Sequence, residues 1–126
     1  MNKPSHVALY VDNLKRAQAF YGAIFAWEFP SYGPGDFSQI TTNSADGGEL
    51  LGALQSRVYA PIPDKVIGAE CTIEVDNLKQ TRKNIIAHGG TIVMEKAAVP
   101  YVGWLIKFLD TEGNLLCVME RDANAR

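Results

Sequence analysis

The chain has 126 residues, a formal net charge of −2 and 47% apolar residues, which is typical of one compact globular unit. It has no run of Lys or Arg, so nucleic acid and anionic membrane surfaces are not expected as partners. Its apolar stretches are too short to span a membrane, and the N-terminus lacks the apolar run of a signal peptide. Cys71 and Cys117 are too few for a disulfide framework, so we expect a cytoplasmic protein with reduced thiols.

The first half of the chain predicts a strand, a helix and two further strands. Apolar residues recur at three- and four-residue spacing from Leu14 to Ile24, which predicts one buried helix face. Asp12 or Asn13 precedes this stretch and can cap it. The strands are expected at residues 6–11, 37–42 and 50–55.

The second half repeats this order with one strand more. A helix is expected from Leu78 to Ile86, capped by Asp76 or Asn77 and ended by Gly89-Gly90. Residues 121–126 are expected to fray. The strands are expected at residues 70–75, 91–95, 104–109 and 115–120.

An internal repeat explains this order. Val-Asp-Asn-Leu-Lys occurs at residues 11–15 and again at 75–79, an offset of 64 positions. Gly48 and Gly113 each precede a Leu-Leu pair, at an offset of 65. We therefore predict one α+β domain over residues 1–126, made of two tandem β-α-β-β-β units that form a curved mixed sheet around a central groove. The repeats are expected at about residues 4–56 and 68–121, joined by a linker at residues 57–67.

Two motifs carry a resemblance to a known family. One is Phe20-Tyr21 within residues 19–27, and the other is the turn from Asp110 through Gly113-Asn114. With the first strand and Gly89-Gly90, they resemble the glyoxalase, bleomycin-resistance and extradiol-dioxygenase (vicinal oxygen chelate) superfamily, and most closely its short "lactoylglutathione lyase-related" subgroup. The chain departs from the family pattern at Ala26, where relatives have Gly, and at Thr111, where they have Pro.

The resemblance implies where a metal would bind in metal-using members. Their ligands come from the start of the first strand and the middle of the last strand of each unit. His6 and Glu70 hold the positions at the start of the first strands. Cys117 holds the position in the last strand of the second unit, and Gly52 is its counterpart in the first unit. These donors are one imidazole, one carboxylate and one thiolate, whereas a catalytic metal usually has three protein ligands and an open position.

Gln55 and Glu120 are the substitutes considered for the weak ligand positions. Each lies three residues further along its strand, so alternation aims it at the opposite face unless a bulge intervenes. Structural roles are the alternative throughout: His6 as a strand-end residue, Glu70 as a solvated carboxylate and Cys117 as a core residue.

The remaining candidate residues would line the groove. Ala8, Tyr10 and Thr72 alternate with core positions along the first strand of each unit. Glu70 and Glu74 are candidate general bases, and Glu74 could equally be a solvated residue at the groove edge. Tyr101 and Trp104 are candidates for the groove mouth, or for the core.

Three functions follow as hypotheses. The favoured one is a small-molecule-binding, homodimeric protein with a degenerate metal site and no certain cofactor. Relatives that use glutathione carry Arg and Asn four residues beyond their first two ligands in chain order, which correspond to His6 and Gly52. This chain has Tyr10 and approximately Ser56 there, so glutathione-dependent lyase activity is not expected. The alternative is a lyase or isomerase that uses nickel, manganese, iron or zinc at His6 and Glu70. A purely structural or regulatory partner protein is the third hypothesis.

Overall fold

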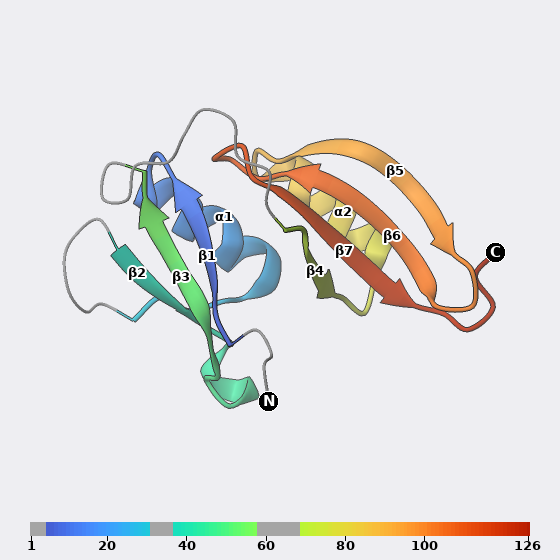
Figure 1. Cartoon of the computed structure of the whole chain (residues 1–126), viewed down its shortest axis with the longest axis horizontal. Helices are drawn as coiled ribbons and strands as arrows, with labels where there is room; N and C mark the ends of the chain where they lie inside the picture. Colours follow the sequence, from blue (N-terminus) through green and yellow to red (C-terminus); the bar gives the residue numbers. More distant parts are fainter. Residues whose placement is uncertain (1–4, 31–36, 58–68) are drawn as a thin grey trace. The chain divides into compact units, whose positions relative to one another are not determined.

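The computed structural model describes residues 5–30, 37–57 and 69–126 (Figure 1). The chain divides into two compact units, Met1–Val66 and Ile67–Arg126, and each combines a sheet with one α-helix in its described part. The predicted α+β class is confirmed. The second unit has the predicted order β-α-β-β-β, and the described part of the first unit has β-α-β-β.

The first unit contains a three-stranded mixed sheet in its described part, with strand order β1-β3-β2. β1 runs parallel to β3, and β2 runs antiparallel to β3. A short 3-10 turn, Ser44–Asp46, connects β2 to β3. The bounds are β1 Val7–Val11, α1 Leu14–Phe25, β2 Phe37–Thr41 and β3 Leu50–Ser56.

The second unit contains a four-stranded mixed sheet among its described residues, with strand order β4-β7-β6-β5. Its β5 is the strand that the first unit was also predicted to have. In the described part of the first unit, that place holds only an isolated bridge between Glu28 and Thr41. The bounds are β4 Cys71–Glu74, α2 Leu78–Ala87, β5 Thr91–Val99, β6 Gly103–Leu109 and β7 Leu115–Arg121.

The same residue type begins both helices. Asn13 accepts a hydrogen bond from the backbone N–H of Arg16 at 3.0 Å, and Asn77 accepts one from Gln80 at 2.9 Å. Asparagine, and not the preceding aspartate, is therefore the N-cap in each repeat. At the end of α1, Ala26 adopts a left-handed conformation with φ 54°. This is the position at which relatives have glycine, because a side chain there is strained.

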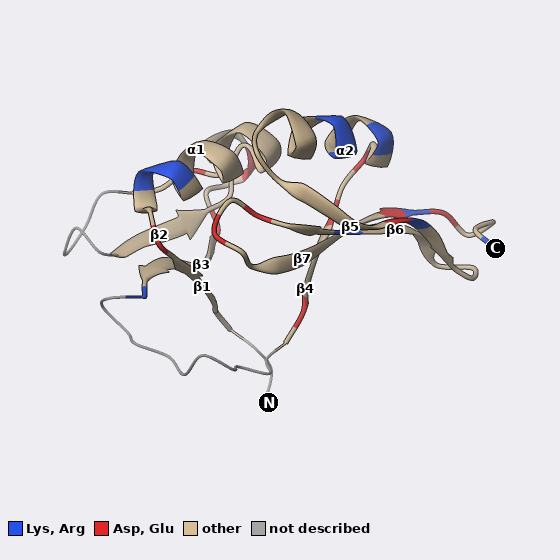
Figure 2. Cartoon of the chain, turned by 90° about the horizontal axis from the view of Figure 1, so that it is seen from above, with Lys and Arg blue, Asp and Glu red and all other residues tan. Residues whose placement is uncertain are grey.

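Each helix covers one face of its own sheet, as Figure 2 shows. Leu9, Val11 and Leu54 are buried on the α1 side of the first sheet. Ile106 and Val118 are buried in the same way on the α2 side of the second. We call the opposite face of each sheet its open face. Strand alternation places residues 8 and 10 of β1, and residues 72 and 74 of β4, on the open faces.

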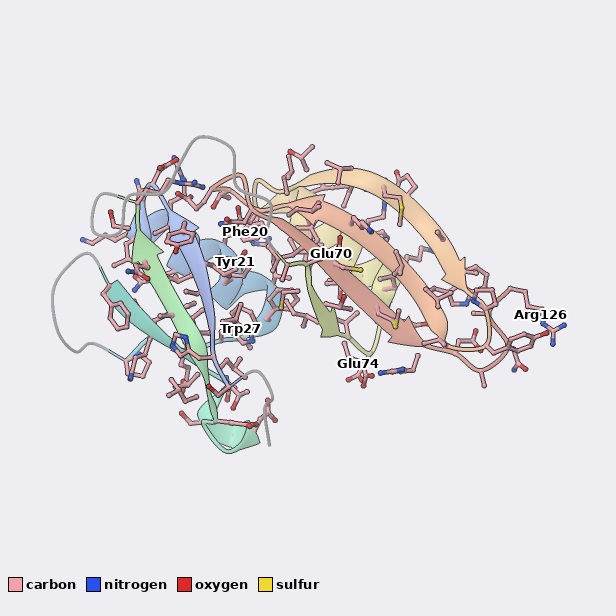
Figure 3. The ribbon with its side chains drawn as sticks, viewed as in Figure 1. Phe20, Tyr21, Trp27, Glu70, Glu74 and Arg126 are labelled. Carbon is pink, nitrogen blue, oxygen red and sulfur yellow. The ribbon has the colours of Figure 1, made fainter. Side chains whose placement is uncertain are left out.

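The motif Phe20-Tyr21 is part of the core of the first unit (Figure 3). Both rings are buried, and they meet edge to face with centroids 5.2 Å apart. Tyr21 also stacks on Trp27 at 5.2 Å. Such aromatic pairs add about 0.5–1.5 kcal/mol each beyond the area they bury. The motif therefore has a packing role.

The motif at residues 110–114 builds a tight turn between β6 and β7. Oδ1 of Asp110 accepts hydrogen bonds from the backbone N–H groups of Glu112 and Asn114, each at 2.8 Å. Gly113 has φ 85°, which a residue with a side chain rarely adopts. This motif is structural as well, and it does not require proline at Thr111.

The parallel strand pairs have the same register in both units. Val7 pairs with Gly52, and Cys71 pairs with Leu116, so both strands of the pair are displaced by 64 positions between the repeats. The Leu-Leu pairs of the sequence are displaced by 65 positions. The structure must therefore accommodate one extra residue within one of the last strands.

A β-bulge accommodates that residue. Ile40 pairs with Gly52 and Thr41 pairs with Leu50, so Leu51 has no partner in β2. Beyond the bulge the repeats return to an offset of 64. The structural counterpart of Cys117 is therefore Ala53, and not Gly52 as the sequence offset indicated.

The C-terminal residues are held in place, so the prediction of a frayed tail is wrong. The indole N–H of Trp104 donates to Asp122 at 3.0 Å, and the backbone N–H of Tyr101 donates to the carbonyl of Ala125 at 2.9 Å. The guanidinium of Arg126 lies 4.7 Å from the centre of the Tyr101 ring. These contacts fix the β5–β6 hairpin tip, where Tyr101 has φ 65°.

We predict that Gly52→Ala destabilises the protein by about 1–3 kcal/mol, the usual cost of inserting a methyl group into a packed site. A Cβ at Gly52 would collide with the carbonyl oxygen of Val7 in the paired strand. Gly22→Ala, within α1, is the matched control. Its Cβ would lie 3.7 Å from the nearest atom, the carbonyl oxygen of Trp27. Alanine is favoured over glycine inside a helix by up to about 1 kcal/mol. Urea denaturation measures both, and equal effects would contradict the assigned β1–β3 register.

Candidate functional site

The predicted site residues of the first unit lie along β1 and β3. His6 directly precedes β1 and is exposed. Ala8 pairs with Ala53 and Tyr10 pairs with Gln55, so these four side chains share the open face. Gln55 lies on this face because Ala53, and not Gly52, is an open-face position, and alternation from Gly52 to Gln55 is regular.

In the second unit, three polar side chains form a row across the open face. Thr72 of β4 pairs with Cys117 of β7, which pairs in turn with Lys107 of β6. Residues paired across neighbouring strands project to the same side of a sheet. The sequence predicts Thr72 and Cys117 near the site, and the structure adds Lys107 to them.

Lys107 forms an ion pair with Glu70, the carboxylate predicted to bind a metal. Its Nζ lies 3.0 Å from Oε2 of Glu70, and the two side chains are 34% and 35% exposed. Lys107 comes from β6 and Glu70 directly precedes β4, the two strands on either side of β7. The pair therefore spans β7 beside Cys117. The sequence feature that could have indicated this pair is the single lysine, Lys107, within the apolar stretch of residues 104–109.

The thiol of Cys117 is enclosed beneath this pair, with only 1% of the residue exposed. Burial raises the pKa of this thiol above its ordinary value of 9.0, and the nearby charge of Glu70 acts in the same direction. A hydrogen bond with Thr72, the second-largest influence, and the charge of Lys107 lower this pKa. Burial is the largest effect, so the thiol stays protonated at neutral pH.

The second candidate base, Glu74, lies at the end of β4 (Figure 3). Its Oε1 is 2.6 Å from Nε of Arg121, and both side chains are more than 60% exposed. An ion pair in this environment is solvated and contributes little to stability. Glu74 therefore corresponds to the solvated edge residue considered as its alternative role.

Glu120 and Trp104 lie on the α2 side of the second sheet, opposite Cys117. They pair with each other across β6 and β7. Oε1 of Glu120 accepts a hydrogen bond from the backbone N–H of Leu78 at 2.9 Å, so it holds the first turn of α2. Tyr101 is 63% exposed at the hairpin tip. The structure thus separates these three residues from the row on the open face.

A cavity of about 440 Å³ also lies on the α2 side. The carboxylate of Glu120 already satisfies the helix N-terminus within it, and Arg82 is held by both oxygens of Glu95 at 2.7 and 2.8 Å. The lining residues are Asp76, Asn77, Leu78, Lys79, Arg82, Lys96, Ile106 and Glu120. The cavity therefore shares none of the residues of the open face.

The donors of the second unit do not by themselves fit a divalent ion. Glu70 is engaged by an ammonium group, and the thiol of Cys117 is protonated, whereas metal ligands must be deprotonated. Among the residues that the structure describes, no group of three or more His, Cys, Asp or Glu side chains could hold a metal ion. His6 belongs to the other unit, so its pairing with Glu70 stays a prediction.

The sequence profile of the Glyoxalase/Bleomycin resistance protein/Dioxygenase superfamily matches residues 3–118, nearly the whole chain. The chain belongs to this superfamily. The comparison with curated proteins found no match to this chain. No helix in residues 5–30, 37–57 or 69–126 is long and apolar enough to cross a membrane.

Solved structures of superfamily members share the fold at low sequence identity. A family enzyme from Burkholderia phytofirmans has 17% identity and a TM-score of 0.78, with 94% of this chain and 98% of that chain covered. A lactoylglutathione lyase from Agrobacterium tumefaciens has 20% identity and a TM-score of 0.68, with 95% and 94% covered. The fosfomycin resistance protein FosX from Listeria monocytogenes, in complex with Mn(II) and sulfate, has 18% identity and a TM-score of 0.73, with 97% and 92% covered.

We predict that stability falls as the pH rises above the ordinary thiol value of 9.0, in part because of Cys117. A pKa raised by folding favours the protonated form in the native state. The contribution of Cys117 to stability is complete below the pKa of the thiol in the unfolded chain, and it is lost as the pH rises through the pKa of the thiol in the folded protein. Denaturation of wild type and Cys117→Ala across this range should give a shallower pH slope for the variant.

A second measurement distinguishes Cys117 from other groups that titrate in the same pH range. In the folded wild type at neutral pH, Cys117 should react with iodoacetamide far more slowly than in denaturant, because the thiolate is the nucleophile and the thiol is buried. Peptide mapping locates the label. Rapid labelling of Cys117 in the native protein, or identical pH slopes, would contradict the assigned environment.

Proposed function

We propose that this protein is a small-molecule-binding member of the glyoxalase superfamily with a degenerate metal site. It binds a small ligand at the open faces of its sheets and lacks glutathione-dependent lyase activity. The observation that carries the proposal is the ion pair between Lys107 and Glu70. It neutralises the carboxylate at a family ligand position with a cation that the chain itself supplies. The groove between the repeats stays a prediction.

The character of the open face supports a binding role. The face carries the Lys107–Glu70 ion pair among apolar strand residues, with the solvated Glu74–Arg121 pair at the end of β4. Pockets for small molecules are commonly apolar with a few polar groups that orient the ligand. Leu115, on this face of β7, is 45% exposed and pairs with Leu109 of β6, so the two side chains offer adjoining apolar surface.

The positions expected to recognise glutathione also support the proposal. Tyr10 lies on the open face and offers no cation for a ligand carboxylate, unlike the arginine of glutathione-using relatives. Ser56 pairs with Val11, and Val11 is buried on the α1 side of the sheet. The two positions are therefore poorly suited to hold the carboxylates of a glutathione conjugate.

A second candidate function is a divalent-metal-dependent lyase or isomerase that uses His6 and Glu70. The observation in its favour is the FosX structure, which shares the fold and contains Mn(II). In this chain His6 is exposed directly before β1, and Glu70 holds the matching position before β4. A bound metal would polarise substrate oxygens, and Glu70 would first have to leave Lys107.

We predict that the purified protein retains no stoichiometric metal after incubation with nickel, manganese, iron or zinc followed by gel filtration. The ammonium of Lys107 opposes a second cation at Glu70, and the protonated thiol is a poor ligand. Elemental analysis and melting temperature measure the outcome. Near-stoichiometric metal that raises the melting temperature, and that is lost in His6→Ala, would overturn the proposal in favour of the second candidate.

We also predict no turnover of the methylglyoxal–glutathione adduct, with or without added nickel or manganese. The reaction needs a metal to polarise the substrate and groups to hold the glutathione carboxylates, and this chain lacks matched residues for both. Spectrophotometric assay of thioester formation measures this activity. Metal-dependent turnover that disappears in both His6→Ala and Glu70→Gln would contradict the proposal.

A further inference from the structure

We infer that the open face of the second unit binds an amphipathic organic anion, whose acidic group replaces Glu70 as the partner of the Lys107 ammonium. This inference rests on the proposed small-molecule binding and adds the chemical class of the ligand. It requires an apolar surface, a cation within that surface, and a present partner of the cation that can leave.

The apolar surface surrounds Lys107 within the sheet. Leu105 pairs with Met119, and Leu109 pairs with Leu115, so one apolar pair lies on either side of the Lys107–Cys117 pair. Alternation along β6 and β7 places all of these side chains on the open face. The part of α2 that packs on this sheet covers the other face (Figure 2). An apolar ligand body can therefore lie against β6 and β7.

The cation lies near the middle of this surface. Lys107 is the fifth residue of the seven-residue strand β6, a strand paired on both sides, with β7 and with β5. Its ammonium can hydrogen-bond a single oxygen of a carboxylate or sulfonate. Lysine covers apolar surface with its alkyl chain while its charged end stays accessible. A ligand with one acidic group and an apolar body matches both features.

Glu70 is the group able to leave. It directly precedes the edge strand β4, so its carboxylate can turn from the sheet into solvent. Lys107 projects from an interior strand and has less freedom to do so. An ion pair in which both side chains are about one-third exposed has a small net free energy, so exchange of one carboxylate for another costs little. This asymmetry between edge and interior favours an anionic ligand over a cationic one.

The test uses the full-length protein and two fluorescent probes with the same aromatic body. One is 8-anilinonaphthalene-1-sulfonate, and the other is the neutral N-phenyl-1-naphthylamine. Wild type should bind both probes. In Lys107→Met, affinity for the sulfonate should fall about tenfold, the equivalent of one charge-assisted hydrogen bond, while affinity for the neutral probe is retained. In Glu70→Gln, sulfonate affinity should rise about threefold or more because the competing charge is removed.

Lys96→Met is the matched control. Lys96 belongs to the same sheet, but its ammonium lies 4.4 Å from the ring centre of Trp104 on the α2 side. Its removal should leave sulfonate binding at the open face unchanged. Melting temperatures of all variants establish that the proteins are folded. Partial unfolding would raise the binding of both probes, so a gain for the sulfonate alone in Glu70→Gln reports the removed charge.

The outcomes separate the two proposals. Failure of both probes to bind folded wild type would contradict small-molecule binding and, with it, this inference. Binding of the neutral probe with sulfonate affinity equal in wild type, Lys107→Met and Glu70→Gln would overturn only the anionic ligand. Loss of sulfonate binding in Lys96→Met, with no change in Lys107→Met, would place the anion in the cavity beside α2 and also overturn the inference.

Discussion

The parallel pairing of the first and last strands of each unit is the constraint on which the other features depend. β1 pairs with β3, and β4 pairs with β7, in one register that is common to both repeats. A slip of one residue would move every side chain of a strand to the other face of its sheet. The pairing therefore decides that Cys117 lies beside Thr72 and that Gln55 lies beside Tyr10. It also holds together segments about 45 positions apart in each unit.

The sequence was sufficient for the fold because its signals are local and occur twice. Helix periodicity, capping asparagines and the 64-residue repeat each depend on nearby residues, and they agree with one another. The bulge at Leu51 could not be predicted in this way, because a bulge is a relation between two strands. It makes Ala53, and not Gly52, the counterpart of Cys117, and Gln55 then shares the open face with Ala53 by regular alternation. The ordered C-terminal residues were missed for a similar reason, since their partners lie in the β5–β6 hairpin.

The candidate site was partly predictable. Glu70, Thr72 and Cys117 follow from alternation and from the family pattern, and the structure places all three around one region of the open face. Lys107 was not predicted, because its proximity to Glu70 depends on the strand order β4-β7-β6. The fold alone does not decide which donors a site offers. FosX shares the fold and contains Mn(II), whereas in this chain an ammonium and a protonated thiol flank Glu70.

The positions of the bulges have a consequence for assembly. In the second sheet, β5 has two register shifts against β6, and in the first the shift lies between β2 and β3. The pairings of β1 and β4 contain none. An irregular outer strand is a poor template for another chain, because its free N–H and C=O groups are unevenly spaced. The second sheet is thus irregular along its β5 edge and regular along its β4 edge, whereas the extra residue of the first sheet lies in the interior strand β3. In the second sheet an added strand would find evenly spaced backbone groups along β4, and the four residues of β4 limit how far such pairing could extend.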